Sequence, residues 1–140
     1  DGVGIKISQE LSSRYSASRL PESIQTRLIL SAGLVPENFT GHLRRFRPDI
    51  VILIDAADMG YEAGCVKWLH WEQTIGMSAS THSLPLSLVA QYLVTEIGCK
   101  VYIIAIQACA NEFCDELSPQ VADAASGVVH TLGALLFARV

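Results

Sequence analysis

The chain has 140 residues, the length of one compact domain rather than two. Half of its residues are apolar and only 17% are charged, which excludes an intrinsically disordered protein. The formal net charge is −4 and the ten basic residues are scattered, so no basic face is expected for a nucleic-acid partner.

The first half of the chain predicts two helices and two strands. Residues 3–17 place apolar side chains at helical spacing, and Pro21 follows the end of this helix. Residues 26–30 are a short strand candidate, and residues 37–46 can form a short helix with arginines near its C-terminus. Residues 49–55 are the clearest strand, because an uninterrupted apolar run is typical of a parallel strand covered on both faces.

The second half predicts two further strands and two helices. Residues 65–70 are expected to form an antiparallel edge strand, and residues 83–97 a helix that Gly98 caps at its C-terminal end. Residues 100–107 are a second strand that is apolar on both faces, and residues 118–138 form a final helix. This order predicts a single three-layer α/β/α domain with a twisted, mostly parallel sheet and one antiparallel edge strand.

The start of the chain is unusual for such a domain. Asp1-Gly2-Val3-Gly4 reads as a turn that opens a helix, with no strand before it. An α/β sheet usually begins with a strand that feeds such a turn. We therefore expect residues 1–140 to be one domain that lacks its first strand through N-terminal truncation.

Targeting signals and cysteine usage point to the cytoplasm. The purest apolar run, Ile50–Ile54, has five residues, against about 20 for a membrane-spanning helix. No basic stretch followed by an apolar run opens the chain, so no signal peptide is predicted. The four cysteines include no Cys-x-x-Cys pair and are expected to be reduced thiols. We expect a cytoplasmic protein that does not insert into membranes.

Three side chains are candidates for a functional site. Ligands of open α/β sheets bind outside the carboxyl ends of the strands, so Asp55, the first charge after the apolar run, is the best candidate for a catalytic group. His82 lies in a small polar stretch ahead of a predicted helix, and Asp1 stands at a turn expected to face the same crevice. Each also has an ordinary explanation, respectively a solvated strand end, an exposed loop histidine and a helix cap.

Together these residues would form a mixed metal site. Two carboxylates and one imidazole suit a divalent first-row metal such as nickel, zinc or manganese, and leave coordination positions open. Their spacing is not a specific motif, and Asp58, three residues after Asp55, is expected to shape a turn.

Other chemistry has little support. The chain has no Gly-x-Ser-x-Gly motif, and Ser83 beside His82 is not a dyad, because adjacent side chains point apart. Gly2-Val3-Gly4 lacks the third glycine of a dinucleotide fingerprint. We therefore expect no tightly bound organic cofactor.

Several strings in the chain resemble a known family. They occur in the family's order along essentially the whole chain: DGVG at 1–4, GLVPEN at 33–38, IDAADMG at 54–60, THSLPL at 81–86, IQ at 106–107 and LSP at 117–119. Together they resemble the hydrogenase maturation endopeptidases, most like the type that processes the hydrogenase-3 large subunit. The chain departs from the family pattern in lacking the first strand, in Ser31 where an acidic residue is common, and in Ala108 where proline is common.

The resemblance implies a cytoplasmic endopeptidase that removes the C-terminal extension of a [NiFe]-hydrogenase large-subunit precursor after nickel insertion. It implies that Asp1, Asp55 and His82 contact the nickel, and that this metal belongs to the substrate. A non-catalytic nickel-sensing chaperone for the same precursor and a peptidase of related fold with other clients remain alternatives. The hydrolytic step is open between attack by a metal-bound water and a carboxylate acting as general base.

Overall fold

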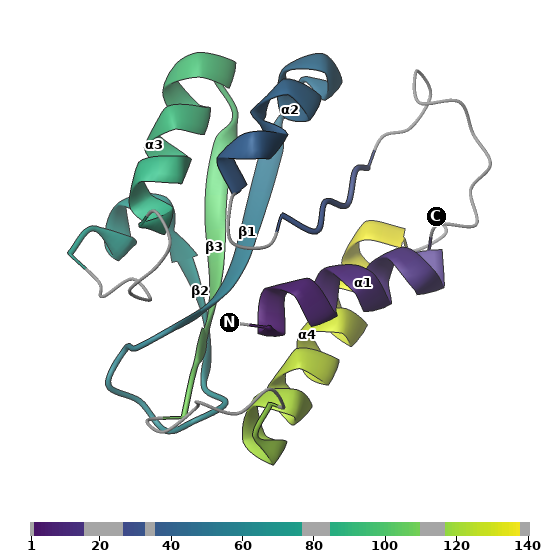
Figure 1. Cartoon of the computed structure of the whole chain (residues 1–140), viewed down its shortest axis with the longest axis vertical. Coiled ribbons are helices and arrows are strands. Elements are labelled where there is room, and N and C mark those ends of the chain that lie inside the picture. Colours follow the sequence, from purple (N-terminus) through teal and green to yellow (C-terminus); the bar gives the residue numbers. More distant parts are fainter. Residues whose placement is uncertain (1, 16–26, 33–35, 77–84, 110–116, 138–140) are drawn as a thin grey trace.

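Three strands form one mixed sheet in the computed structural model, which describes residues 2–15, 27–32, 36–76, 85–109 and 117–137. The strand order within these residues is β1-β3-β2 (Figure 1). β1 (Ile50–Ala57) is parallel to β3 (Lys100–Gln107), and β2 (Val66–His70) is antiparallel to β3 on its other edge. The predicted antiparallel edge strand is therefore confirmed.

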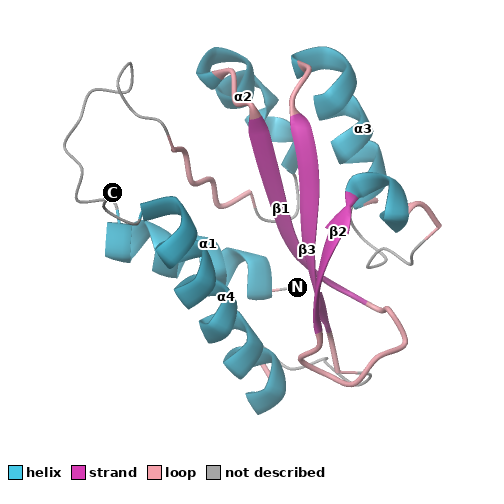
Figure 2. Ribbon diagram, turned by 180° about the vertical axis from the view of Figure 1, so that it is seen from behind, coloured by secondary structure: helices cyan, strands magenta, loops and turns pink. Residues whose placement is uncertain are grey.

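Helices cover both faces of this sheet, which makes three layers (Figure 2). α1 (Val3–Tyr15) and α4 (Pro119–Phe137) share one buried core with the sheet, in which Ile7, Ile106 and Val129 take part. α3 (Leu86–Ile97) buries its apolar side chains on the other face, where Leu43 of α2 (Thr40–Phe46) packs against them. The predicted α/β/α architecture is thus confirmed. No helix among the described residues is long and apolar enough to cross a membrane.

Local sequence signals predicted several boundaries of strands and helices correctly. β3 has the bounds that its apolar run predicts, and its residues from Ile103 onward are buried. Gly98 ends α3 in a left-handed conformation with φ 76°, and its N–H donates to the carbonyls of Leu93 and Val94. α3 begins at Leu86, while residues 83 and 84 of the predicted helix lie outside the described part of the chain.

Two predicted elements need correction. The predicted strand at 26–30 is wrong over residues 27–30, which form no regular structure, and Thr26 lies outside the described residues. A strand needs a partner to complete its hydrogen bonds, whereas this apolar segment instead packs side chains such as Ile29 against the core beside α1. The predicted helix 37–46 consists of a 3₁₀ helix, Pro36–Phe39, followed by α2, and it ends at Arg47 with φ 54° directly before proline.

β1 is more exposed than a fully covered parallel strand. Ile50 is 54% exposed and the other residues of β1 are only partly buried, whereas β3 is the well-buried central strand. Within the described residues, β1 pairs with β3 alone. The strand that was predicted to be internal therefore lies at the edge of the described sheet.

Candidate functional site

Asp55 lies two residues before the end of β1, on the face of the sheet that α3 covers. Leu53, two residues earlier on the same face, packs against the α3 core, and the register pairs Asp55 with the small residue Ala105. Its Oδ1 accepts a hydrogen bond of 2.8 Å from the N–H of Ala56. Burial raises the pKa of the Asp55 carboxyl, and this backbone hydrogen bond offsets the effect only in part. A desolvated carboxylate in this position is suited to bind a cation or to hold a proton.

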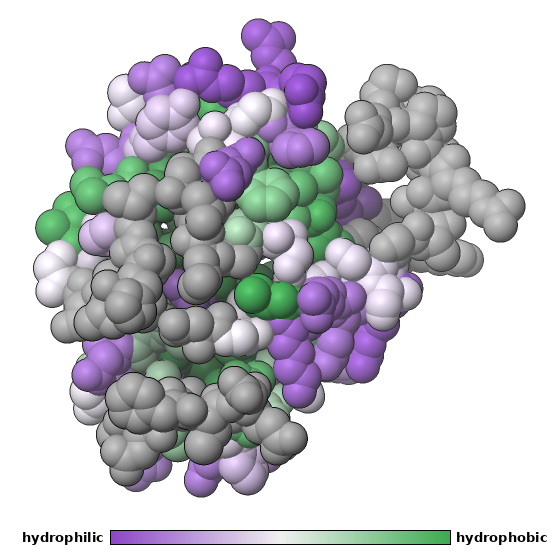
Figure 3. All heavy atoms as spheres, viewed as in Figure 1, coloured by the Kyte–Doolittle hydropathy of each residue, from purple (hydrophilic) through white to green (hydrophobic). Residues whose placement is uncertain are grey.

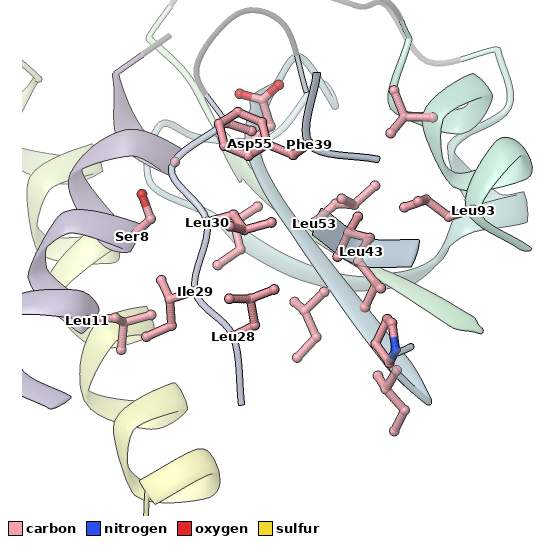
Figure 4. Close-up of a pocket in the computed structure, with 18 of the residues that line it drawn as sticks. Ser8, Leu11, Leu28, Ile29, Leu30, Phe39, Leu43, Leu53, Asp55 and Leu93 are labelled. Carbon is pink, nitrogen blue, oxygen red and sulfur yellow. The ribbon is translucent and has the colours of Figure 1, made fainter. Parts of the chain in front are cut away.

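Asp55 also borders an apolar cavity of about 320 Å³ (Figure 4). The close-up shows leucine side chains around this space, from the 27–32 segment, α2, β1 and α3, with Asp55 at one end. On the face shown in Figure 3, apolar side chains reach the surface below α2. Gly4 in the first turn of α1 and Leu86 at the start of α3 line the same cavity. The Asp55 side chain therefore lies at the edge of an apolar surface.

The other two predicted ligands, Asp1 and His82, lie outside the described residues. Asp1 precedes Gly4 by three residues, and a Cβ on Gly4 would lie 2.5 Å from the carbonyl oxygen of Ile54. His82 precedes Leu86 by four residues. Asp1 and His82 thus belong, in the sequence, to the segments that directly precede α1 and α3, whose first turns border the cavity beside Asp55. The described residues alone contain no group of three His, Cys, Asp or Glu side chains that could hold a metal.

Asp58 has the turn role expected for it. Its side chain is exposed, and Oδ1 accepts a hydrogen bond of 3.3 Å from the N–H of Gly60, which has φ 75°. The same oxygen accepts a bond of 3.2 Å from Nε2 of Gln107.

Gln107 was noticed in the sequence only as part of the string at 106–107, and its structural role was missed. It ends β3, its exposed fraction is 6%, and its side chain bonds to the residues that follow β1. The available signal was a polar residue at the end of an otherwise apolar strand. Because its partners lie 46 to 49 positions away, no local pattern identified them.

The described cysteines do not suggest a nucleophile. Cys65, Cys99 and Cys109 are free thiols. Cys99 is 4% exposed, burial raises the pKa of its thiol, and its Sγ donates to the carbonyl of Leu93 at 3.7 Å. A thiol that is buried and harder to ionise is a structural group rather than a reactive one.

Comparison with known proteins gives a consistent result. Residues 5–134 match a family described as hydrogenase maturation protease. A protein of Methanocaldococcus jannaschii named for the same activity is 33% identical over 132 residues, covering 94% of this chain and 78% of its own length. The Hydrogenase 3 maturation protease of Escherichia coli K12 is 27% identical over 106 residues, covering 75% of this chain and 67% of its own.

Solved structures share the fold. The [NiFe] hydrogenase maturation protease HycI from Thermococcus kodakarensis superposes with a TM-score of 0.80 at 27% identity, covering 98% of this chain and 83% of that one. The hydrogenase maturating endopeptidase HybD from E. coli gives a TM-score of 0.72 at 22% identity, with 97% and 83% covered. The second similarity is one of fold alone.

Proposed function

The chain belongs to the hydrogenase maturation protease family, and from this membership we propose that it removes the C-terminal extension of a [NiFe]-hydrogenase large-subunit precursor. The reaction is hydrolysis of one peptide bond after nickel has been inserted into the precursor. The family match, which spans residues 5–134, carries the proposal. Within the structure it is supported by Asp55, a partly buried carboxylate at the carboxyl end of β1. We further propose that the reaction takes place in the cytoplasm, which agrees with free thiols at the described cysteines.

We propose that the nickel ion is cargo of the substrate and is contacted by Asp55 together with Asp1 and His82. The reach of the chain supports this set of ligands. At about 3.5 Å per residue, the three-residue stretch between Asp1 and Gly4 can span at most roughly 10 Å and the four-residue stretch between His82 and Leu86 at most roughly 14 Å, and both Gly4 and Leu86 are among the residues that line the cavity beside Asp55. Two carboxylates and one imidazole leave coordination positions for the precursor's own donors.

For the hydrolytic step we propose that Asp55 is the catalytic carboxylate. When the precursor is bound, its nickel supplies Lewis acidity next to the peptide bond that is cut. The desolvated Asp55 carboxylate is suited either to bind this cation or to accept a proton from the attacking water.

Incubating the purified chain with nickel-loaded precursor and weighing the large subunit tests the proposal. We expect the loss of a C-terminal peptide with nickel-loaded precursor and an intact mass with nickel-free precursor. An intact large subunit in a stable complex with the chain would overturn the proposal in favour of a nickel-sensing chaperone. Cleavage of nickel-free proteins would show a peptidase with other clients.

A further inference from the structure

Both ends of the connection between β1 and β2 are fastened to a single residue of β3, Gln107. Near the β2 end, the N–H of Gly64 donates to the Gln107 carbonyl at 2.9 Å, and the N–H of Gln107 donates to the Cys65 carbonyl at 2.8 Å. Near the β1 end, Oε1 of Gln107 accepts hydrogen bonds from the N–H of Met59 at 2.6 Å and of Tyr61 at 3.3 Å.

The side-chain amide of Gln107 uses its full hydrogen-bonding capacity. Besides the two bonds accepted by Oε1, Nε2 donates to Oδ1 of Asp58 at 3.2 Å and to the carbonyl of Ala108 at 3.1 Å. An amide has two acceptor positions and two donor hydrogens, so each has a partner. A polar side chain that is both buried and fully bonded holds its partners in one arrangement.

This arrangement extends the pairing of β1 and β3 past the end of the backbone ladder. Among the backbone bonds between described residues of β1 and β3, the one farthest along the strands joins the N–H of Ala108 to the Ala57 carbonyl at 3.3 Å, and the Gln107 side chain bonds residues 58, 59 and 61 beyond it. Asp55 lies three residues before Asp58, and its register partner Ala105 lies two residues before Gln107 on the same face. The hydrogen bonds of Gln107 therefore hold the backbone that follows Asp55.

We propose that Gln107 is a positioning residue for precursor cleavage. It holds residues 58–61 against β3, so that the Asp55 carboxylate and the loop beside it keep a fixed orientation toward the bound precursor. Gln107 acts through these hydrogen bonds and not through contact with the reacting atoms. The inference rests on the proposed cleavage reaction.

The variant Gln107→Glu tests this role with little change in shape. It keeps an oxygen for the N–H groups of Met59 and Tyr61, but turns the Nε2 donor into an oxygen that faces Oδ1 of Asp58 and the Ala108 carbonyl. We expect kcat to fall about 10- to 100-fold through loss of orientation. We expect KM to change by less than about threefold, because a protein substrate is bound over a much wider surface.

A second substitution provides the rescue. Asp58→Asn added to Gln107→Glu removes the repulsion between two carboxylates and supplies an amide donor, so we expect kcat to recover about threefold or more. Hydrogen exchange at the Met59 and Tyr61 amides should increase in Gln107→Glu and decrease again in the double variant.

Thr74→Val is the matched control. It deletes another hydrogen bond of a buried polar side chain, from Oγ1 of Thr74 to the Trp71 carbonyl at 2.6 Å. That bond lies in the 3₁₀ helix after β2, whose last residue, His70, pairs with Tyr102, three positions before the Asp55 partner Ala105. We expect this variant to lower the melting temperature and to leave kcat within about twofold, since it removes one ordinary hydrogen bond.

The outcomes separate this inference from the proposed function. If the wild-type chain leaves the nickel-loaded precursor intact, both are wrong. If the wild-type chain cleaves and Gln107→Glu matches its kcat, or if Thr74→Val lowers kcat as much as Gln107→Glu does, the positioning role alone is wrong. Loss of kcat without recovery in the double variant would also overturn it.

Discussion

Asp55 and Asp58 have different surroundings, although only three residues separate them. The Asp55 carboxylate is partly buried beside an apolar cavity, and burial raises its pKa. The Asp58 carboxylate is exposed, and its Oδ1 accepts hydrogen bonds from the N–H of Gly60 and from Nε2 of Gln107. An asparagine side chain keeps an Oδ1 acceptor but carries no charge. An Asp→Asn substitution at either position therefore removes the charge with little change in shape.

We predict that Asp55→Asn lowers precursor cleavage at least about 100-fold, because it removes the charge next to the proposed metal and scissile bond. Asp58→Asn should remain within about threefold of wild type, because its turn needs only an acceptor. Single-turnover cleavage of nickel-loaded precursor measures both. If Asp58→Asn abolishes cleavage and Asp55→Asn does not, the site assignment is wrong.

Asp55→Asn should stabilise the free protein, although it is expected to lower cleavage. Burial raises the pKa of Asp55 in the folded protein above its unfolded value, so above the unfolded pKa the ionised carboxylate destabilises the fold. Asp55→Asn should therefore melt at a higher temperature than wild type at pH 7, and this difference should shrink as the pH falls toward about 4, where both states take up the proton.

Thermal unfolding at both pH values, in the presence of a chelator, measures the difference. Asp58→Asn is the matched amide control. A lower melting temperature for Asp55→Asn at pH 7 would contradict the prediction, because it would mean that the charge stabilises the folded protein.

His82→Ala should weaken recognition of the nickel-loaded precursor. A neutral imidazole is a common ligand of first-row metals, and loss of one donor from a three-donor site should lower cleavage at subsaturating precursor about 10- to 100-fold. Binding of wild type and variant to nickel-loaded and nickel-free precursor measures the effect. Equal loss of affinity for both forms of the precursor would show that His82 does not contact the metal.

At the scale of elements, the bounds of a strand were most predictable where a continuous apolar run marks them in the sequence. β3 has the expected bounds because every residue from Val101 to Ile106 is apolar and is buried or partly buried. The apolar residues at 26–30 carried a similar signal, but a short apolar run does not reveal whether a neighbouring strand is available to pair with it.

The candidate site was predictable only in part, for a related reason. Asp55 followed from the rule that ligands gather at the carboxyl ends of parallel strands. The bonds of Gln107 join residues that are far apart in the sequence, so only the structure shows them.

The contact of α1 with β1 gives a prediction at the same scale. A Cβ on Gly4 would lie 2.5 Å from the Ile54 carbonyl oxygen, so Gly4→Ala must push α1 away from the strand that carries Asp55. We expect a loss of about 1–3 kcal/mol in the free energy of unfolding, together with slower cleavage.

Gly127→Ala in α4 is the matched control. A Cβ on Gly127 would meet nothing within 4 Å, so this variant should gain up to about 1 kcal/mol from helix propensity. Denaturant unfolding measures both variants, and equal effects of the two substitutions would contradict the close approach of α1 to β1.

At the scale of the whole molecule, the cavity beside Asp55 lies among α1, α2, β1 and α3. Its lining includes side chains of both cores, such as Leu11 from one and Leu93 from the other. An apolar space of about 320 Å³ is large enough for a small apolar ligand.

We predict that the native protein binds the dye ANS at pH 7, because apolar cavities of this size accept apolar molecules. Leu53→Trp, which projects a larger side chain into this space, should lower the dye fluorescence by about half or more. Circular dichroism should show that the variant remains folded. Native wild-type protein with no dye fluorescence above that of a compact control protein would show that the cavity is closed in solution.

The pairing of Asp55 with Ala105 has a consequence for how such proteins can diverge. The carboxylate takes its place from strand register and from the hydrogen bonds of Gln107, so insertions between Tyr61 and Gly64, between the two bonded ends of the connection, can reshape the loop surface without moving Asp55. A single-residue insertion within β1 ahead of Asp55 would instead turn that side chain to the opposite face of the sheet. Under the proposed role of Asp55, loop variation can change the substrate surface, whereas the length of β1 up to Asp55 must stay constant.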